Sequence, residues 1–181
     1  TCLFKRYLHD KFDHNMKATV QPEFAIKQEI MNDKSLKIQI WDTSGIEISD
    51  TAGISICKRA VAAIICYDLT NFRSFESAQL WVDSIRTNEE NCEIFLCGTK
   101  FDLINEAKVP RQVEYQKIKD YANEIHAKFF EISSLTGENV GELFSCVTKT
   151  CLEKQQVEKK PKEIPSVTLM EEKRDNHRPC M

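Results

Sequence analysis

The sequence predicts an α/β fold in which one antiparallel hairpin precedes a mostly parallel sheet. Two strand-like segments, 24–30 and 37–41, flank a polar turn, which is typical of a hairpin. The run 61–67 is apolar without alternation, as in a strand covered on both faces, so we expect it in the middle of a sheet. Beyond it, strand-like and helical segments alternate, as they do when helices connect parallel strands.

The later elements follow from the spacing of apolar residues. This spacing predicts helices over 75–85, 118–125 and 140–151, and strands at 94–97 and 129–132. Ser74 stands where it can cap the first of these helices.

The pattern stops after Leu152. Residues 153–181 are rich in Lys and Glu and carry three of the five prolines. Residues 1–152 are therefore predicted to form one domain, and residues 153–181 a flexible tail.

Composition limits the class of protein. Charged residues make up 29% of the chain and the net charge is -3, so no basic field is available to bind nucleic acid. The eight cysteines show no CxxC pair and no metal-type spacing, which indicates free thiols in a reducing compartment. No signal peptide and no apolar stretch of bilayer length is found, so we predict a cytoplasmic protein.

Residues 99–102, with the sequence TKFD, follow an apolar strand and predict recognition of a purine. The Asp102 carboxylate can accept hydrogen bonds from both the ring N–H and the exocyclic amine of guanine, a pattern that adenine cannot present. Lys100 can lie along the purine face, and Thr99 can tie neighbouring loops together. The alternative is a polar loop that binds no ligand.

Two further loops carry residues suited to a nucleotide. Asp42 ends the second strand and can hold Mg²⁺ through water, while the backbone N–H of Gly45 can approach a terminal phosphate. In the loop 133–137, backbone N–H groups can face the purine O6. Each loop alone also fits a simple turn or helix cap. Because ligands bind where parallel strands end, the combination favours a nucleotide site.

These loops resemble, in order, the motifs of a Rab-type small GTPase of the Ras superfamily. The matching segments are WDTSG at 41–45, CYDLT at 66–70, TKFDL at 99–103 and EISSLTG at 131–137. The resemblance extends from Thr1 to about Leu152, and Thr99 in place of the usual asparagine is similar to the atypical Rab subfamily numbered twenty-four. It implies a Ras-like P-loop GTPase fold, mostly parallel with one antiparallel hairpin pair.

The resemblance also implies a function and a set of ligands. It implies a GTP-binding switch in intracellular vesicle traffic, with autophagy or late endosomal transport as the pathway. GTP or GDP and Mg²⁺ are the implied cofactors, and effectors, exchange factors and a GDP-dissociation inhibitor are the implied partners of the switch regions. The implied Mg²⁺ ligands are Thr1, Thr19 and, through water, Asp42. The implied nucleotide-binding residues are Thr1, Cys2, Thr19, Gly45, Thr99, Lys100, Asp102, Leu103, Ser133, Ser134 and Leu135.

The chain departs from the family at its start. Thr1 corresponds to the last residue of the phosphate loop, so the first strand and the GxxxxGK motif that cradles phosphates do not precede it. In the resembling fold that strand lies between the strands 37–41 and 61–67, whose facing edges would lose backbone partners. We interpret the chain as a fragment of a longer protein, with a degenerate homologue as the alternative, and expect poor GTP binding from it as written.

A second departure is Ile46, which stands where the family usually has the glutamine that orients the attacking water. GTP hydrolysis is implied by the resemblance but is expected to be slow or absent here. Residues 48–57 lack the usual second-switch aromatics, whereas Phe24 and Trp41 stand where Rabs expose two aromatic side chains to effectors.

The tail offers one candidate modification. Cys180 is a lipidation site by resemblance, because Rabs end in prenylated cysteines, although it is out of frame for a CaaX box. A lipid there would hold the protein peripherally on endomembranes, and the alternative is an unmodified thiol.

Two other function classes stay open. A nucleotide-independent pseudo-GTPase interaction module fits Ile46 and the missing phosphate loop. A phospho-acceptor signalling domain, with Asp68 as acceptor, fits the topology but leaves Asp42 and Asp102 without a role.

Overall fold

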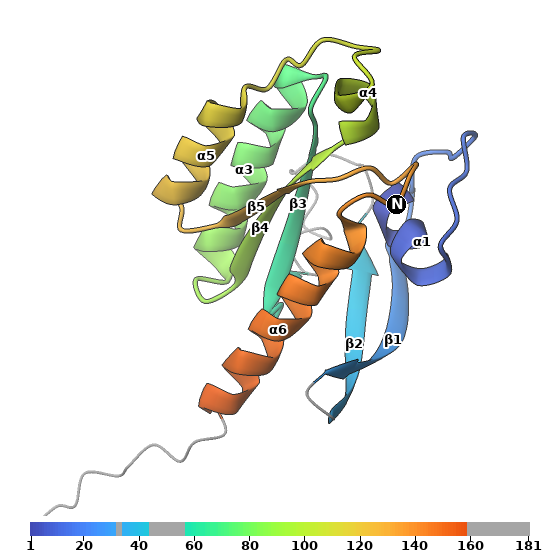
Figure 1. The fold of residues 1–181 in the computed structure, drawn as a ribbon. Coiled ribbons are helices and arrows are strands. Elements are labelled where there is room, and N and C mark those ends of the chain that lie inside the picture. Colours follow the sequence, from blue (N-terminus) through green and yellow to red (C-terminus); the bar gives the residue numbers. More distant parts are fainter. Residues whose placement is uncertain (32–33, 44–56, 159–181) are drawn as a thin grey trace, which may run out of the picture.

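The computed structural model describes residues 1–31, 34–43 and 57–158 as two sheets flanked by helices (Figure 1). The elements are α1 (Cys2–His9), β1 (Glu23–Met31), β2 (Lys34–Asp42), β3 (Ala62–Asp68), α3 (Phe72–Asn88), β4 (Glu93–Thr99), α4 (Phe101–Asn105), α5 (Tyr115–Glu124), β5 (Lys128–Glu131) and α6 (Val140–Glu158). Strands and helices alternate after residue 61, which confirms the predicted α/β class.

The hairpin prediction is confirmed. β1 and β2 pair antiparallel, from Glu23 opposite Asp42 to Met31 opposite Lys34. The ladder extends into the polar run, since Met31 and Lys34 are register partners. Phe24 and Trp41 are register partners with ring centroids 4.7 Å apart, and both side chains are about half exposed.

The parallel sheet has the order β3-β4-β5. Its central strand, β4, is buried at five successive positions, from Ile94 to Gly98. β3 lies at the edge of this sheet in the described part of the chain, so the expectation that the run 61–67 lies in the middle of a sheet is not met. Among the described residues β3 pairs only with β4, and on β3 Ile64 is half-buried and Cys66 is exposed.

Helix α3 begins one turn earlier than predicted. Its N-cap is Asn71, whose side chain accepts a hydrogen bond from the Arg73 N–H at 3.1 Å. The prediction that Ser74 caps the helix is wrong. Ser74 lies inside the first turn, where its hydroxyl accepts from the Asp68 N–H at 2.8 Å and so joins the helix to the end of β3.

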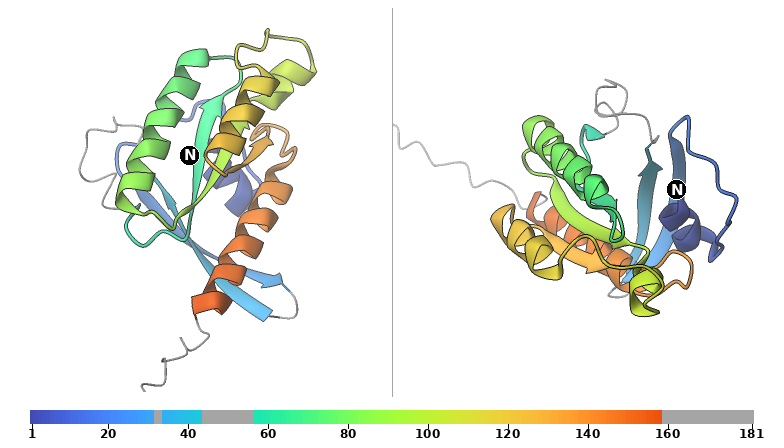
Figure 2. Two further views of the ribbon diagram at one scale, coloured as in Figure 1. Left: turned by 90° about the vertical axis from the view of Figure 1, so that its left-hand side faces the viewer. Right: turned by 90° about the horizontal axis from the view of Figure 1, so that it is seen from above.

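Two apolar cores cover the two faces of the parallel sheet. On one face, β3 and β4 pack against α3 and α5, with Phe75 and Ile118 fully buried between them. On the other face, β4 packs against α1 and α6, where Tyr7 stacks on Phe144 with ring centroids 3.5 Å apart. The two further views in Figure 2 show the β1–β2 pair standing beside this sheet and separate from it.

Some element boundaries differ from those that the apolar spacing predicts. α6 continues to Glu158, six residues beyond the point where its apolar pattern ends, and residues 159–181 lie outside the described part. The short helices α1 and α4 are additional to the predicted elements. Within residues 1–31, 34–43 and 57–158, no helix combines the length and the apolar character needed to cross a bilayer.

Candidate functional site

The TKFD segment lies where β4 ends and α4 begins. Thr99, the last residue of β4, donates from its hydroxyl to the carbonyl of Tyr67 on β3 at 2.8 Å, so it ties the two strand ends together as predicted. Phe101 donates its N–H to the carbonyl of Ile132 at 3.0 Å. The segment is therefore anchored on both sides, to β3 and to the loop that follows β5.

Lys100 adopts the left-handed backbone conformation, with φ 64°, at the start of α4. Its ammonium group lies 2.7 Å from the Asp68 carboxylate, which also accepts from the N–H and the hydroxyl of Thr70 at 2.8 and 2.7 Å. Burial opposes ionisation of Asp68, but the hydrogen bonds from Lys100 and Thr70 outweigh it and lower the pKa of the carboxyl group. Asp68 thus serves as the partner of Lys100, which disfavours its role as a phospho-acceptor.

Asp102 is the buried carboxylate of the site, with 7% of its surface exposed. It lies in the first turn of α4, where a negative charge is favoured by the helix dipole. The Ser133 hydroxyl donates to Asp102 Oδ1 at 2.6 Å, and Ser133 itself is fully buried. This short bond fixes the orientation of the Asp102 carboxylate. A carboxylate that accepts hydrogen bonds from two donors of one purine needs such a fixed orientation.

The loop 133–137 forms a tight turn around Ser133. The Gly137 N–H donates to the Ser133 carbonyl at 2.9 Å, and the Thr136 N–H donates to the Ser133 hydroxyl at 3.1 Å. By contrast, the N–H groups of Ser134 and Leu135 donate to no residue that the structure describes. Two unused donors therefore lie beside Asp102, as the predicted contact with a purine oxygen requires.

Arg6 of α1 holds this loop from the other side, and nothing in the sequence pattern pointed to it. Its Nε donates to the Ser134 carbonyl at 2.7 Å, and its Nη2 donates to the Leu135 carbonyl at 2.6 Å. Its Nη1 donates to Asp10 Oδ1 at 2.8 Å. The side chain is only 13% exposed, so α1 and the loop behave as one unit. A contact across 128 positions leaves no local signal in the sequence.

The three predicted Mg²⁺ ligands meet at the end of β2. The backbone nitrogen of Thr1 lies 3.0 Å from Asp42 Oδ1, and the hydroxyl of Thr19 lies 3.5 Å from Asp42 Oδ2. The hydroxyls of Thr1 and Thr19 are themselves hydrogen-bonded. Two hydroxyl oxygens together with a single carboxylate suit Mg²⁺, which takes its remaining ligands from water and phosphate. In the described part of the chain, no cluster of three or more His, Cys, Asp or Glu side chains is arranged to hold a metal ion.

The other predicted site residues divide into two groups. Cys2 opens α1 and Leu103 lies in α4, each partly buried and next to a predicted ligand residue. Gly45, Ile46 and Cys180 lie outside the described residues, so the predictions for them stay predictions.

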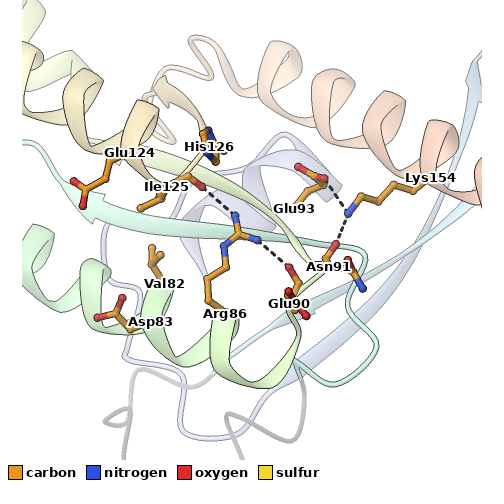
Figure 3. Close-up of a pocket in the computed structure, with 10 residues that line it drawn as sticks. All are labelled: Val82, Asp83, Arg86, Glu90, Asn91, Glu93, Glu124, Ile125, His126 and Lys154. Atoms are coloured by element: carbon orange, nitrogen blue, oxygen red, sulfur yellow. Dashed lines mark hydrogen bonds and ion pairs between the residues drawn. The ribbon is translucent and has the colours of Figure 1, made fainter.

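A cavity of about 540 Å³ lies at the opposite end of the sheet, near the start of β4 (Figure 3). The Arg86 guanidinium crosses it and donates to the carbonyls of Cys92 and Ile125 at 2.9 and 3.1 Å. Lys154 forms an ion pair with Glu93 at 2.9 Å. These cations are therefore paired with groups of the protein itself.

Comparisons with known proteins agree with this geometry. The model of the Ras family matches residues 1–153. The chain is 36% identical over 149 residues to the Ras-related protein Rab-24 of Dictyostelium discoideum, covering 82% of this chain and 73% of that protein. It is 30% identical over 166 residues to the Ras-like GTP-binding protein RYL2 of Yarrowia lipolytica, covering 90% and 79% of the two chains.

Proposed function

This chain belongs to the Ras family as a Rab-type small GTPase, and from that premise we propose that it carries the base-reading half of a GTP-operated switch in vesicle traffic. The observation that carries the proposal is the Asp102–Ser133 pair at the ends of β4 and β5. The oriented carboxylate accepts the ring N–H and the amine of guanine, while the unused N–H groups of Ser134 and Leu135 face the base oxygen. Adenine would be rejected, because its ring nitrogen at this edge is an acceptor and would face the Asp102 carboxylate, which also only accepts.

Thr1, Thr19 and Asp42 are the residues that would hold Mg²⁺ beside the phosphates. The ion supplies positive charge that neutralises the phosphate oxygens. Thr19 lies in the segment between α1 and β1. Contact of its hydroxyl with the ion can therefore order this segment. Ile46 offers no polar group to orient water, which supports slow hydrolysis and a long-lived GTP state.

We further propose a role for the protein in a particular step of vesicle traffic. Similarity to the protein named Rab-24 supports the atypical subfamily, and with it a role in autophagy or late endosomal transport. Phe24 and Trp41 form an exposed aromatic pair that suits an effector. Cys180 is the residue that a prenyl group would modify to hold the protein on the cytoplasmic face of endomembranes.

A nucleotide-independent interaction module is the second candidate. It is favoured by one observation, namely that Ile46 stands where the family usually has the glutamine that orients the attacking water. The aromatic pair on the hairpin would then act without control by a nucleotide.

Binding of fluorescent nucleotides separates the two candidates. We expect GDP and GTP analogues with Mg²⁺ to bind more tightly than ADP, and Asp102→Asn to shift the preference from guanine toward xanthine nucleotides. Ser134→Ala serves as the matched control, because the contact assigned to Ser134 uses its backbone. If no guanine nucleotide binds in preference to ADP, the interaction module is the better description. Unchanged preference in Asp102→Asn would refute the base assignment alone.

A further inference from the structure

The turn that follows β5 contains two neighbouring carbonyl groups that one side chain holds. Arg6 of α1 donates from Nε to the Ser134 carbonyl at 2.7 Å and from Nη2 to the Leu135 carbonyl at 2.6 Å. Within the part of the chain that the structure describes, no other residue donates to either carbonyl. Figure 1 shows α1 beside the connection from β5 to α6 that carries these groups. The direction of both carbonyls is therefore set by Arg6.

The first of these carbonyls shares a peptide plane with a donor that the site needs. The Ser134–Leu135 peptide is trans, and in a planar trans peptide the C=O and the N–H point in opposite directions. A group that holds the Ser134 oxygen therefore also aims the N–H of Leu135. This N–H is one of the two donors of the loop that no described residue uses. Because Arg6 lies on one side of the loop, the Leu135 N–H points to the other side.

The second carbonyl begins a chain of hydrogen bonds that ends on the base-reading carboxylate. The Leu135 carbonyl, which accepts from Arg6, shares its peptide with the Thr136 N–H. That N–H donates to the Ser133 hydroxyl at 3.1 Å, and the hydroxyl donates to Asp102 Oδ1 at 2.6 Å. All donors in this chain run in the same direction, so each bond polarises and strengthens the next. The charge of Arg6 therefore strengthens the bond that orients Asp102.

The surroundings of Arg6 suit this role. Its side chain is only 13% exposed and Ser134 is buried, so the bonds form where water is mostly excluded and charge-assisted hydrogen bonds are strong. The planar guanidinium holds two neighbouring oxygens at once, which a lysine ammonium cannot reproduce. Its Nη1 pairs with Asp10 at 2.8 Å, but that carboxylate is exposed, so the ion pair is weak and the loop is the main partner of Arg6.

We propose that Arg6 is a positioning residue for recognition of the base. From the far side of the loop it aims the Leu135 N–H at the purine O6 and, through Ser133, it fixes the Asp102 carboxylate. The inference rests on the proposed function, because it assigns Arg6 to the base site described there. The alternative is that Arg6 only anchors α1 to the loop, and the two roles change base preference differently.

The test compares the affinities of GDP and 6-thio-GDP, in which sulfur replaces the purine O6 and the ring N–H and the amine are kept. Each nucleotide displaces a fluorescent GDP analogue from the full chain in the presence of Mg²⁺, and ADP is measured in parallel. Sulfur is the weaker acceptor, so a correctly aimed N–H makes the wild type prefer GDP. We expect Arg6→Ala to weaken GDP binding about tenfold and to reduce the preference for GDP over 6-thio-GDP by about threefold or more.

Two further variants control for the ion pair and for folding. Asp10→Asn removes the ion pair and keeps both loop bonds, so it should leave the preference for GDP over 6-thio-GDP unchanged. Arg6→Lys keeps the charge but not the fork, so an intermediate preference is expected. Circular dichroism reports the folding of each variant, and Arg6→Lys carries the test if Arg6→Ala does not fold.

The outcomes separate this inference from the proposed function. If the Arg6 variants weaken GDP and 6-thio-GDP by the same factor, Arg6 is only an anchor and the inference is overturned. The proposed function stands in that case, provided that the wild type prefers GDP to ADP. If the wild type binds GDP no better than ADP, the proposed function fails and the inference fails with it.

Discussion

Replacing Arg6 with alanine should lower the free energy of unfolding by about 3 kcal/mol. The guanidinium donates two charge-assisted hydrogen bonds to the carbonyls of Ser134 and Leu135, at 2.7 and 2.6 Å. Bonds of this kind contribute about 1.5–3 kcal/mol each, and the two share one donor group, so their sum is less than additive. The ion pair with Asp10 adds only about 0.3–0.5 kcal/mol, because the Asp10 side chain is 91% exposed.

Two further variants separate the loop contacts from the ion pair. Arg6→Lys keeps the charge, but one ammonium group cannot reproduce the planar fork, so about half of the loss should appear. Asp10→Asn removes the ion pair and keeps a residue suited to the left-handed conformation at this position, where φ is 52°. It should cost less than about 0.5 kcal/mol.

Urea unfolding followed by circular dichroism measures all three variants. For a chain of this size, about 3 kcal/mol corresponds to a fall of about 6–12 °C in Tm. Hydrogen exchange at the Gly137 amide, which donates to Ser133, should accelerate in Arg6→Ala and stay unchanged in Asp10→Asn. If Arg6→Ala costs no more than Asp10→Asn, the two loop bonds do not stabilise the fold and the reasoning is wrong.

Three other perturbations have expected outcomes. Ser133→Ala should cost about 2 kcal/mol in urea unfolding, because it leaves the Asp102 carboxylate without its buried donor. Gly98→Ala should cost about 1–3 kcal/mol, because the new Cβ would lie 2.7 Å from Leu69 Cδ2 in a buried strand. The depressed pKa of Asp68 means that its contribution to stability is present above the ordinary value of 3.8 and is lost as the pH falls through the lower folded value. The free energy of unfolding should therefore fall more steeply below pH 3.8 in the wild type than in Asp68→Asn.

The substitutions of Ser133 and Gly98 each have a matched control. Ser134→Ala removes a hydroxyl that donates to no described residue and should have little effect on stability. Gly141→Ala adds a Cβ that meets nothing within 4 Å in α6 and should stabilise the helix by about 0.5–1 kcal/mol. If the two variants of a pair lose the same free energy of unfolding, the corresponding contact is contradicted. The ion pair of Asp68 is contradicted if the free energy of unfolding falls equally steeply below pH 3.8 in Asp68→Asn and in the wild type.

The sequence by itself determined the order and type of the long elements and the polar residues of the TKFD loop at the end of β4. Hydrophobic periodicity is local, so the hairpin, the parallel strands and the helices α3, α5 and α6 follow from runs of a few residues. The pairing of Asp102 with the loop at Ser133 could also be expected, because the ends of parallel strands meet at one edge of the sheet.

Only the tertiary structure decided which distant groups meet. Arg6 reaches a loop 128 positions away, and Lys100 pairs with Asp68 across two strand ends. Asn71 caps α3 while Ser74 joins the helix to β3, a choice made by the geometry of the β3–α3 connection. These contacts join residues far apart in the sequence, whereas hydrophobic periodicity records only the local environment of each residue.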